Sequence, residues 1–159
     1  MKIAIVSGHS EGPSKLNAFD NALYEAEIGD VNLIKVSSML ESNTEVEELP
    51  KLKAGAMVNC VLSEITSDIK GDKLIACVAV AIGDELGCVV ENSGINKNPG
   101  DIKAEAIISY RESNRGLSKG LVEGRIKKSI CVKSASSVKS AFQKTSAEVS
   151  IICGRKKSV

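Results

Sequence analysis

The hydrophobic positions of the chain recur with two different periods, which divide it into several short strands and two helices. The predicted strands are short, aliphatic and bounded by Gly or by polar turns. They cover residues 3–7, 31–37, 56–67, 73–82, 87–92, about 125–134 and 147–153. A polar, Glu-rich loop separates the second strand from the third, and the segment after residue 7 (GHSEGPSK) has the Gly and Pro content of a loop.

Helical spacing of apolar residues appears twice. Over residues 15–27, apolar side chains recur at Leu16, Phe19, Leu23 and Ala26, Ser14 can cap the first turn, and Gly29 can end the helix. A second helix is predicted over residues 102–113, with Asp101 as its cap.

The connections between the predicted strands are short. D-I-K-G-D joins 56–67 to 73–82, and G-D-E-L joins 73–82 to 87–92, which suits antiparallel neighbours. Few helices and many hairpin-linked strands predict an α+β fold, a layered β-sandwich in one domain over residues 1–159.

Composition narrows the functional classes. Hydrophobic residues make up 43% of the 159 residues but aromatic residues only 3%, so the core must be aliphatic. Lys and Arg number 21 against 20 Asp and Glu, a formal charge of +1, which gives no field that attracts nucleic acid or an acidic membrane. The apolar run at the N-terminus is too short for a signal peptide, and no run approaches a membrane span.

The cysteines argue for a reducing compartment and against a metal site. Their number is odd, their spacing is wide and no C-x-x-C occurs, which disfavours both a disulfide framework and zinc. They stand at Cys60, Cys77, Cys88, Cys131 and Cys153. We therefore expect a soluble cytoplasmic protein without a metal.

Two motifs imitate well-known sites. G-H-S-E-G-P-S-K resembles a phosphate-binding loop, but three residues rather than four separate its glycines, and Pro13-Ser14 precedes the lysine. His9 is the only histidine and has no partner nearby in sequence, so a surface position is the simpler interpretation.

Three polar residues in apolar surroundings are stronger candidates. Glu91 ends the run GCVVE, and at a strand end beside a core, desolvation favours the protonated form of a carboxyl group. Asp20 follows Phe19 on the first predicted helix, and Asn32 begins the strand that leads to the serine pair. Each also has an ordinary interpretation: an exposed strand-end Glu, a solvated helix Asp and a turn-forming Asn.

The run LIKVSSML raises the question of why Ser37 and Ser38 stand together at the end of a strand. A small polar turn is the usual answer. The alternative is that a strained serine attacks the preceding carbonyl, forms an ester and, through β-elimination and hydrolysis, leaves an N-terminal pyruvoyl group. The dipeptide alone does not favour this chemistry.

The surrounding sequence resembles a known family. LNAFDNALYEAEIGDVNLIKVSSM (16–39), ELPKLKAGAMV (48–58), TSDIKGDKLIACVAVAI (66–82), GCVVE (87–91) and, more loosely, RIKKSICVK (125–133) are similar to motifs of the pyruvoyl-dependent arginine decarboxylases. The resemblance covers most of the chain and is strongest from 16 to 91. It implies decarboxylation of arginine to agmatine and CO2.

Residue by residue, the resemblance implies self-cleavage between Ser37 and Ser38, which gives a β chain 1–37 and an α chain 38–159 with a pyruvoyl group derived from Ser38. Asn32 matches the residue that polarises the Ser37 carbonyl during cleavage. The ketone forms a Schiff base with the substrate, and Glu91 matches the proton donor.

The resemblance also implies the rest of the pocket. Asp20 matches the carboxylate that meets the substrate guanidinium, and Leu23 and Met39 match residues that line the pocket. Asp20 and Leu23 are expected to share one face of the helix. The implied assembly is a homotrimer or a dimer of trimers of αββα subunits, with active sites between subunits.

The sequence departs from the family in ways that leave alternatives open. M-L-E-S follows the cut without the proline that members commonly have there, and the Ser- and Lys-rich C-terminal part lacks an expected histidine. An uncleaved, non-catalytic paralogue that binds a small cation or partners another subunit is the second hypothesis. A single carboxylate at Asp20 also leaves lysine and ornithine open as substrates.

Overall fold

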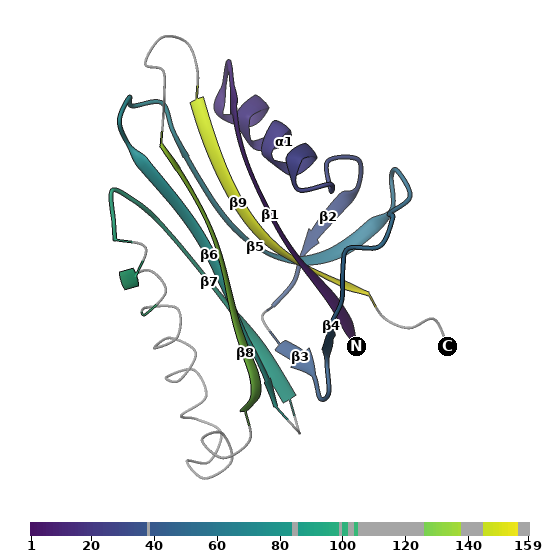
Figure 1. The fold of residues 1–159 in the computed structure, drawn as a ribbon. Coiled ribbons are helices and arrows are strands. Elements are labelled where there is room, and N and C mark those ends of the chain that lie inside the picture. The colour runs from purple at the N-terminus through teal and green to yellow at the C-terminus, as the bar shows by residue number, and fades with distance from the viewer. Residues whose placement is uncertain are drawn as a thin grey trace.

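A computed structural model describes residues 1–37, 39–83, 86–98, 100–101, 104, 126–137 and 145–155. These residues are mostly strand, with one helix of several turns (Figure 1). In chain order the elements are β1 (Lys2–Gly12), α1 (Lys15–Glu25), β2 (Asn32–Lys35), β3 (Met39–Glu41), β4 (Glu45–Val46), β5 (Met57–Ser67), β6 (Lys73–Gly83), β7 (Leu86–Ile95), β8 (Ile126–Ser137) and β9 (Thr145–Arg155).

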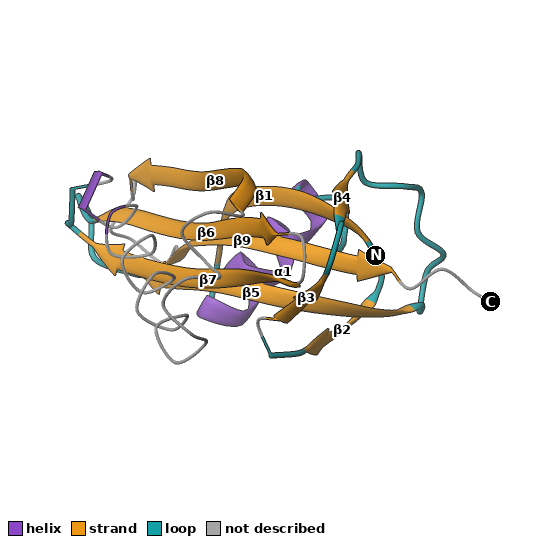
Figure 2. Cartoon of the chain, turned by 90° about the horizontal axis from the view of Figure 1, so that it is seen from below, coloured by secondary structure: helices purple, strands orange, loops and turns teal. Residues whose placement is uncertain are grey.

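The strands form two sheets. Sheet I has the order β2-β5-β9-β1-β4, and sheet II has the order β3-β7-β6-β8. Most ladders are antiparallel, whereas β2 pairs with β5 and β4 pairs with β1 in parallel. In Figures 1 and 2 the long strands of both sheets run alongside one another, and α1 lies on the face of sheet I that points away from sheet II.

Aliphatic side chains from both sheets form one core cluster. Ile3 and Val61 come from sheet I, and the members from sheet II include Val78, Val80 and Val89. A second cluster lies on the other face of sheet I, where α1 contributes its small, buried residues. The expected aliphatic core and the α+β class are confirmed, while the second predicted helix (102–113) lies outside the described residues except for Ala104.

Two glycines of β1 allow α1 to lie directly on the strand. A Cβ atom at Gly8 would overlap the carbonyl oxygen of Ala22, and one at Gly12 would stand 2.5 Å from the amide nitrogen of Ala18. The glycines that imitate a phosphate-binding loop therefore serve helix packing. The loop predicted after residue 7 is wrong, because β1 continues and pairs with β9 as far as Gly12.

The predicted first helix is confirmed with a small difference at its end. Ser14 caps it, since its Oγ accepts a hydrogen bond from the Asn17 amide at 3.2 Å. The helix ends at Glu25, and Glu27 takes the left-handed conformation (φ 61°) that the sequence assigned to Gly29.

The connection between β5 and β6 differs from the prediction of a hairpin. The two strands belong to different sheets, so the D-I-K-G-D turn carries the chain from sheet I to sheet II. A buried network fixes this turn: Ser67 Oγ donates to the Asp72 carboxylate at 2.6 Å, and Asn96 Nδ2 donates to its other oxygen at 2.8 Å. The hairpin from β6 to β7 is confirmed.

Two short strands, β3 and β4, replace part of the loop predicted after residue 37. Among the residues that the structure describes, no helix is long and apolar enough to cross a membrane.

Candidate active site

The chain changes sheets at the serine pair. β2 ends at Lys35 in sheet I, and the Val36 amide still donates to the Cys60 carbonyl of β5 at 3.0 Å. β3 begins at Met39 in sheet II, where Met39 pairs with Cys88 of β7. Ser37 is exposed between the two strands, and Ser38 lies outside the described residues. The chain therefore passes from sheet I to sheet II between Lys35, where β2 ends, and Met39, where β3 begins (Figure 1).

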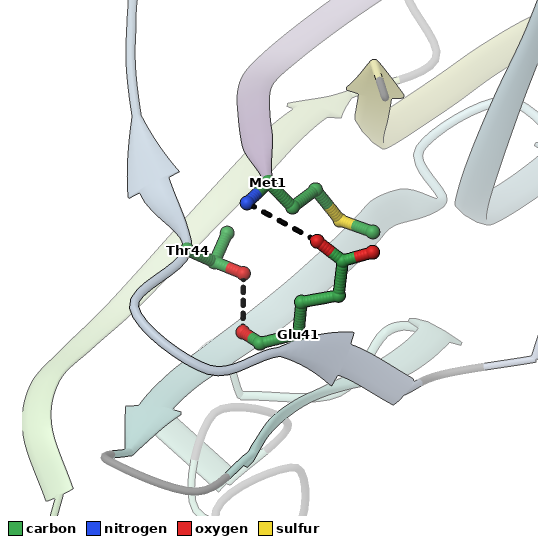
Figure 3. Close-up of polar contacts among 3 residues, drawn as sticks. All are labelled: Met1, Glu41 and Thr44. Atoms are coloured by element: carbon green, nitrogen blue, oxygen red, sulfur yellow. Dashed lines mark hydrogen bonds and ion pairs between the residues drawn. The ribbon is translucent and has the colours of Figure 1, made fainter. Parts of the chain in front are cut away.

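Contacts on both sides hold this crossing in place. After the crossing, Leu40 of β3 is buried in the core between the sheets. Figure 3 shows the turn that follows, in which Thr44 Oγ1 donates to the Glu41 carbonyl at 2.6 Å and the Met1 ammonium pairs with the Glu41 carboxylate at 3.3 Å. Sequence reasoning missed these contacts, although E-S-N-T has the composition of a turn.

Glu91 lies on the strand beside which the crossing segment arrives. It stands three residues after Cys88 in β7, roughly 10 Å along the strand. Glu91 pairs with Val78, and both share the sheet face that carries Val89 in the core between the sheets. Its side chain is nevertheless exposed, since β3 covers only residues 86–88 of β7.

The predicted surroundings of Glu91 need correction in two respects. β7 continues to Ile95, so Glu91 lies inside the strand and not at its end. The side chain is also exposed in the single chain, where the sequence suggested an apolar environment. Gly87, Cys88 and Val89 are all buried, Val90 is half-buried and Glu91 is exposed, so exposure increases along the run GCVVE toward the edge of sheet II.

Asn32 is held away from the serine pair of its own chain. Its side-chain amide donates to the Gly55 carbonyl at 2.9 Å, and its backbone amide donates to the Ala56 carbonyl at 2.8 Å. Ser37 lies five residues further on, roughly 16 Å in an extended chain. Within one chain, the Asn32 side chain therefore does not reach the Ser37 carbonyl.

Asp20 and Leu23 belong to α1 and so to the opposite side of sheet I from Glu91 (Figure 1). Asp20 is exposed, whereas Leu23 is 9% exposed and packs in the cluster between helix and sheet. The two are neighbours on the helix, but only Asp20 is accessible from outside. A single chain therefore does not bring Asp20 and Glu91 together.

Exposed apolar side chains surround the crossing segment. Ile34 and Val36 precede the serine pair and Met39 follows it, with exposed fractions from 37% to 55%. Met57, which is 68% exposed, lies at the other end of β2, opposite Asn32. In the cluster beneath α1, burial raises the pKa of the Cys60 thiol. At the end of α1, a hydrogen bond to Asp30 raises the pKa of Tyr24.

A pocket of about 290 Å³ lies elsewhere, between the start of β1 and the loop before β5. Lys2, Leu49, Lys51 and Met57 are among its lining residues, and none of the sequence-predicted site residues is. Within the described ranges, no three His, Cys, Asp or Glu side chains converge as metal ligands would. Val36, Ser37 and Met39, which are exposed next to the strand that carries Glu91, are therefore the better candidates.

Comparison with known protein families identifies the family to which most of the chain is similar. Residues 2–146 match a family described as pyruvoyl-dependent arginine decarboxylase (PvlArgDC). The matched range includes both serines and every other candidate residue named above.

Curated relatives carry the same description. A pyruvoyl-dependent arginine decarboxylase of Methanothermobacter thermautotrophicus is 59% identical over 119 residues, which cover 74% of this chain and 79% of the relative. Those of Methanocaldococcus jannaschii and Pyrococcus furiosus are 42% and 39% identical over 95 and 100 residues. These alignments cover 58% and 60% of this chain and 58% and 63% of the relatives.

Proposed function

The chain belongs to the pyruvoyl-dependent arginine decarboxylase family, and we propose that it converts L-arginine to agmatine and carbon dioxide. One structural observation supports this most directly. The chain passes from sheet I to sheet II at the serine pair and arrives beside the strand that bears Glu91. The proposed cleavage site and the carboxylic acid Glu91 therefore lie along the same edge of sheet II.

We infer that the chain cleaves itself between Ser37 and Ser38 into a β chain 1–37 and an α chain 38–159. The described neighbours fit a pyruvoyl group made from Ser38, since Ser37 is accessible and Met39 is held beside Cys88 by the β3–β7 ladder. The group supplies an electron-withdrawing ketone, which lets the substrate carboxylate depart as CO2.

The remaining roles follow from the chemistry of each side chain. Asp20 offers two oxygens to a planar guanidinium, which prefers such a partner. Glu91 is accessible and can deliver a proton to the substrate α-carbon after CO2 leaves. Met39, which is 55% exposed beside the cut, supplies apolar surface for the substrate's methylene chain. Leu23, which the resemblance assigns to the pocket lining, is 9% exposed in the single chain and would contribute only from beneath α1.

The active site is proposed to form between subunits of a homotrimer or a pair of trimers. Asp20 and Glu91 lie on different layers of one chain, so a substrate that touches both needs a second copy. The exposed Ile34, Val36 and Met57 are apolar surface that a neighbouring subunit can cover. The same arrangement can bring Asn32 of one subunit to the Ser37 carbonyl of another.

The proposed location is the cytoplasm, and the proposed subunit has αββα layers. In support of the first, Cys60, Cys77 and Cys88 are not in disulfide bonds, as expected in a reducing compartment. In support of the second, α1 covers the outer face of sheet I. The predicted helix 102–113 would supply the fourth layer.

Intact mass spectrometry tests the proposed cleavage. The purified chain should separate under denaturing conditions into two fragments divided after Ser37, and the larger one should react with hydroxylamine at its ketone. Ser38→Ala should remain full length and release no CO2 from arginine. Ser42→Ala, which changes another exposed serine close by, should cleave normally.

A panel of arginine, lysine and ornithine tests the substrate. CO2 release should be fastest with arginine, because only its guanidinium matches two carboxylate oxygens at once. A chain that stays full length and binds an arginine analogue without turnover would instead be the non-catalytic paralogue. Rapid turnover by Ser38→Ala would exclude the pyruvoyl mechanism.

A further inference from the structure

A single buried hydroxyl group connects the two sheets next to Glu91. Ser63 of β5 is 3% exposed and lies in sheet I. Its Oγ donates a hydrogen bond to the Asn92 carbonyl of β7 at 2.7 Å and accepts one from the Cys77 amide of β6 at 3.3 Å. One side chain of sheet I thus bonds to the backbone of two adjacent strands of sheet II.

The position of this contact relative to Glu91 follows from the strand register. Cys77 pairs with Asn92, and the next pair along the ladder is Val78 with Glu91. The Ser63 bond therefore fixes the backbone at the residue that follows Glu91.

This part of β7 has support on one side only within its own sheet. β6 pairs with it throughout, but β3 pairs only with residues 86–88, so the described part of β7 that carries Glu91 is a sheet edge. Backbone at a sheet edge opens more readily than backbone between two strands. The hydrogen bond from Ser63 in sheet I therefore restrains the β7 backbone where β3 does not pair with it.

We propose that Ser63 is a positioning residue that sets the place of the Glu91 carboxyl group by holding the β7 backbone at Asn92. The inference rests on the proposed role of Glu91 as proton donor. A proton donor must lie within hydrogen-bond distance of the reacting atom, and a displacement of about 1 Å can cost on the order of 100-fold in rate. Binding of the guanidinium by Asp20 is independent of this contact, because Asp20 lies on α1.

The chain offers a matched control in Ser67. It lies in the same strand on the same face, is 4% exposed, and donates a bond of 2.6 Å from its hydroxyl to Asp72 at the β5–β6 turn. Ser63→Ala and Ser67→Ala each remove one buried hydroxyl from β5. Only the first removes a bond to the backbone beside Glu91.

Hydrogen exchange measures how strongly the β7 backbone is protected, and it does so independently of enzyme activity. Amides of residues 89–95 should exchange several-fold faster in Ser63→Ala than in Ser67→Ala or the parent chain. Ser63→Thr and Ser63→Val add the same bulk and differ only in the hydroxyl, so Thr should restore protection relative to Val. Equal exchange in Ser63→Ala and Ser67→Ala would overturn the proposal.

Kinetics of the cleaved enzyme test the link to Glu91. Ser63→Ala should lower kcat for arginine by about ten-fold or more with KM changed less than about two-fold, and Ser67→Ala should change kcat much less. In a Glu91→Gln background the Ser63→Ala change should have no further effect, because Ser63 acts through Glu91. An equal loss of kcat in both backgrounds, or full kcat in Glu91→Gln, would refute the positioning role.

The tests of Ser63 can fail independently of the tests of arginine decarboxylation. If the parent chain releases no CO2 from arginine, the proposed decarboxylation fails and the positioning role fails with it. If the parent chain is active and Ser63→Ala behaves as Ser67→Ala does, only the positioning role fails.

Discussion

Asp20 and Leu23 differ in accessibility although they are neighbours on one helix. Leu23 packs beneath α1, and Asp20 points away from the cluster that Leu23 joins. Among the described residues Asp20 makes no salt bridge, so its carboxylate is available to a cationic ligand from outside.

The Asp20→Asn variant tests this availability. Loss of the charge-assisted hydrogen bonds to a guanidinium should raise KM for arginine by about ten-fold to 100-fold, with a smaller effect on kcat. Glu48→Gln removes another exposed carboxylate, outside the proposed site, and should leave KM unchanged. Steady-state CO2 release at varied arginine concentration gives KM for both variants. An unchanged KM in Asp20→Asn would show that another group binds the guanidinium.

Single residues were easier to select from the sequence than to place in space. The serine pair, Glu91 and Asp20 are candidates that the neighbouring residues and the family resemblance select. The distance between Asp20 and Glu91 could not be predicted, because it depends on which face of which sheet α1 covers. Gly8 was misinterpreted for a related reason: close approach of a helix leaves no signal in the local pattern.

At the scale of elements, β5 and β6 show that a sequence pattern predicts where a strand lies but not which strand it pairs with. The predicted bounds of both strands agree with the structure within a few residues. The predicted pairing of β5 with β6 does not agree, because alternation reports that a strand has one buried face and says nothing about the strand beside it. The short turn between them suggested a hairpin, yet Asp72 and its partners direct the chain into the second sheet.

The Asp72→Ala variant measures what this turn contributes to stability. It leaves the Ser67 hydroxyl and the Asn96 amide without their acceptor, which should cost about 2 kcal/mol in the free energy of unfolding. Asp72→Asn keeps one carbonyl oxygen and should lose less, and Asp68→Ala in the same turn is exposed and should be nearly neutral.

Urea unfolding in the uncleaved Ser38→Ala background, at one fixed protein concentration, provides the measurement, since each subunit is then one continuous chain. Equal midpoints for Asp72→Ala and Asp68→Ala would show that the buried carboxylate does not hold the turn.

The proposed cut divides the whole molecule unequally without separating its layers. Residues 1–37 contain β1, α1 and β2, all on the side of sheet I. β1 lies between β4 and β9 and pairs with β9 from Lys2 to Gly12. The small fragment therefore supplies an interior strand of a sheet whose other long strands belong to the large fragment.

The two fragments should remain associated after cleavage. Size-exclusion chromatography under native conditions should give one peak that contains both masses, and separation should require denaturant. The uncleaved Ser38→Ala chain is the control for the elution volume. Loss of the small fragment in native buffer would contradict the extensive β1–β9 pairing.

The interior place of β1 also determines how the protein recovers from denaturation. Before the cut, β1 returns to its position by a folding step within one chain, whose rate does not depend on concentration. After the cut, the same step is an encounter between two molecules, and its rate falls as the sample is diluted. Cleavage would thus make unfolding irreversible in dilute solution. The uncleaved precursor can refold β1 into its sheet within one chain, whereas the cleaved enzyme, once unfolded at low concentration, does not recover its small chain.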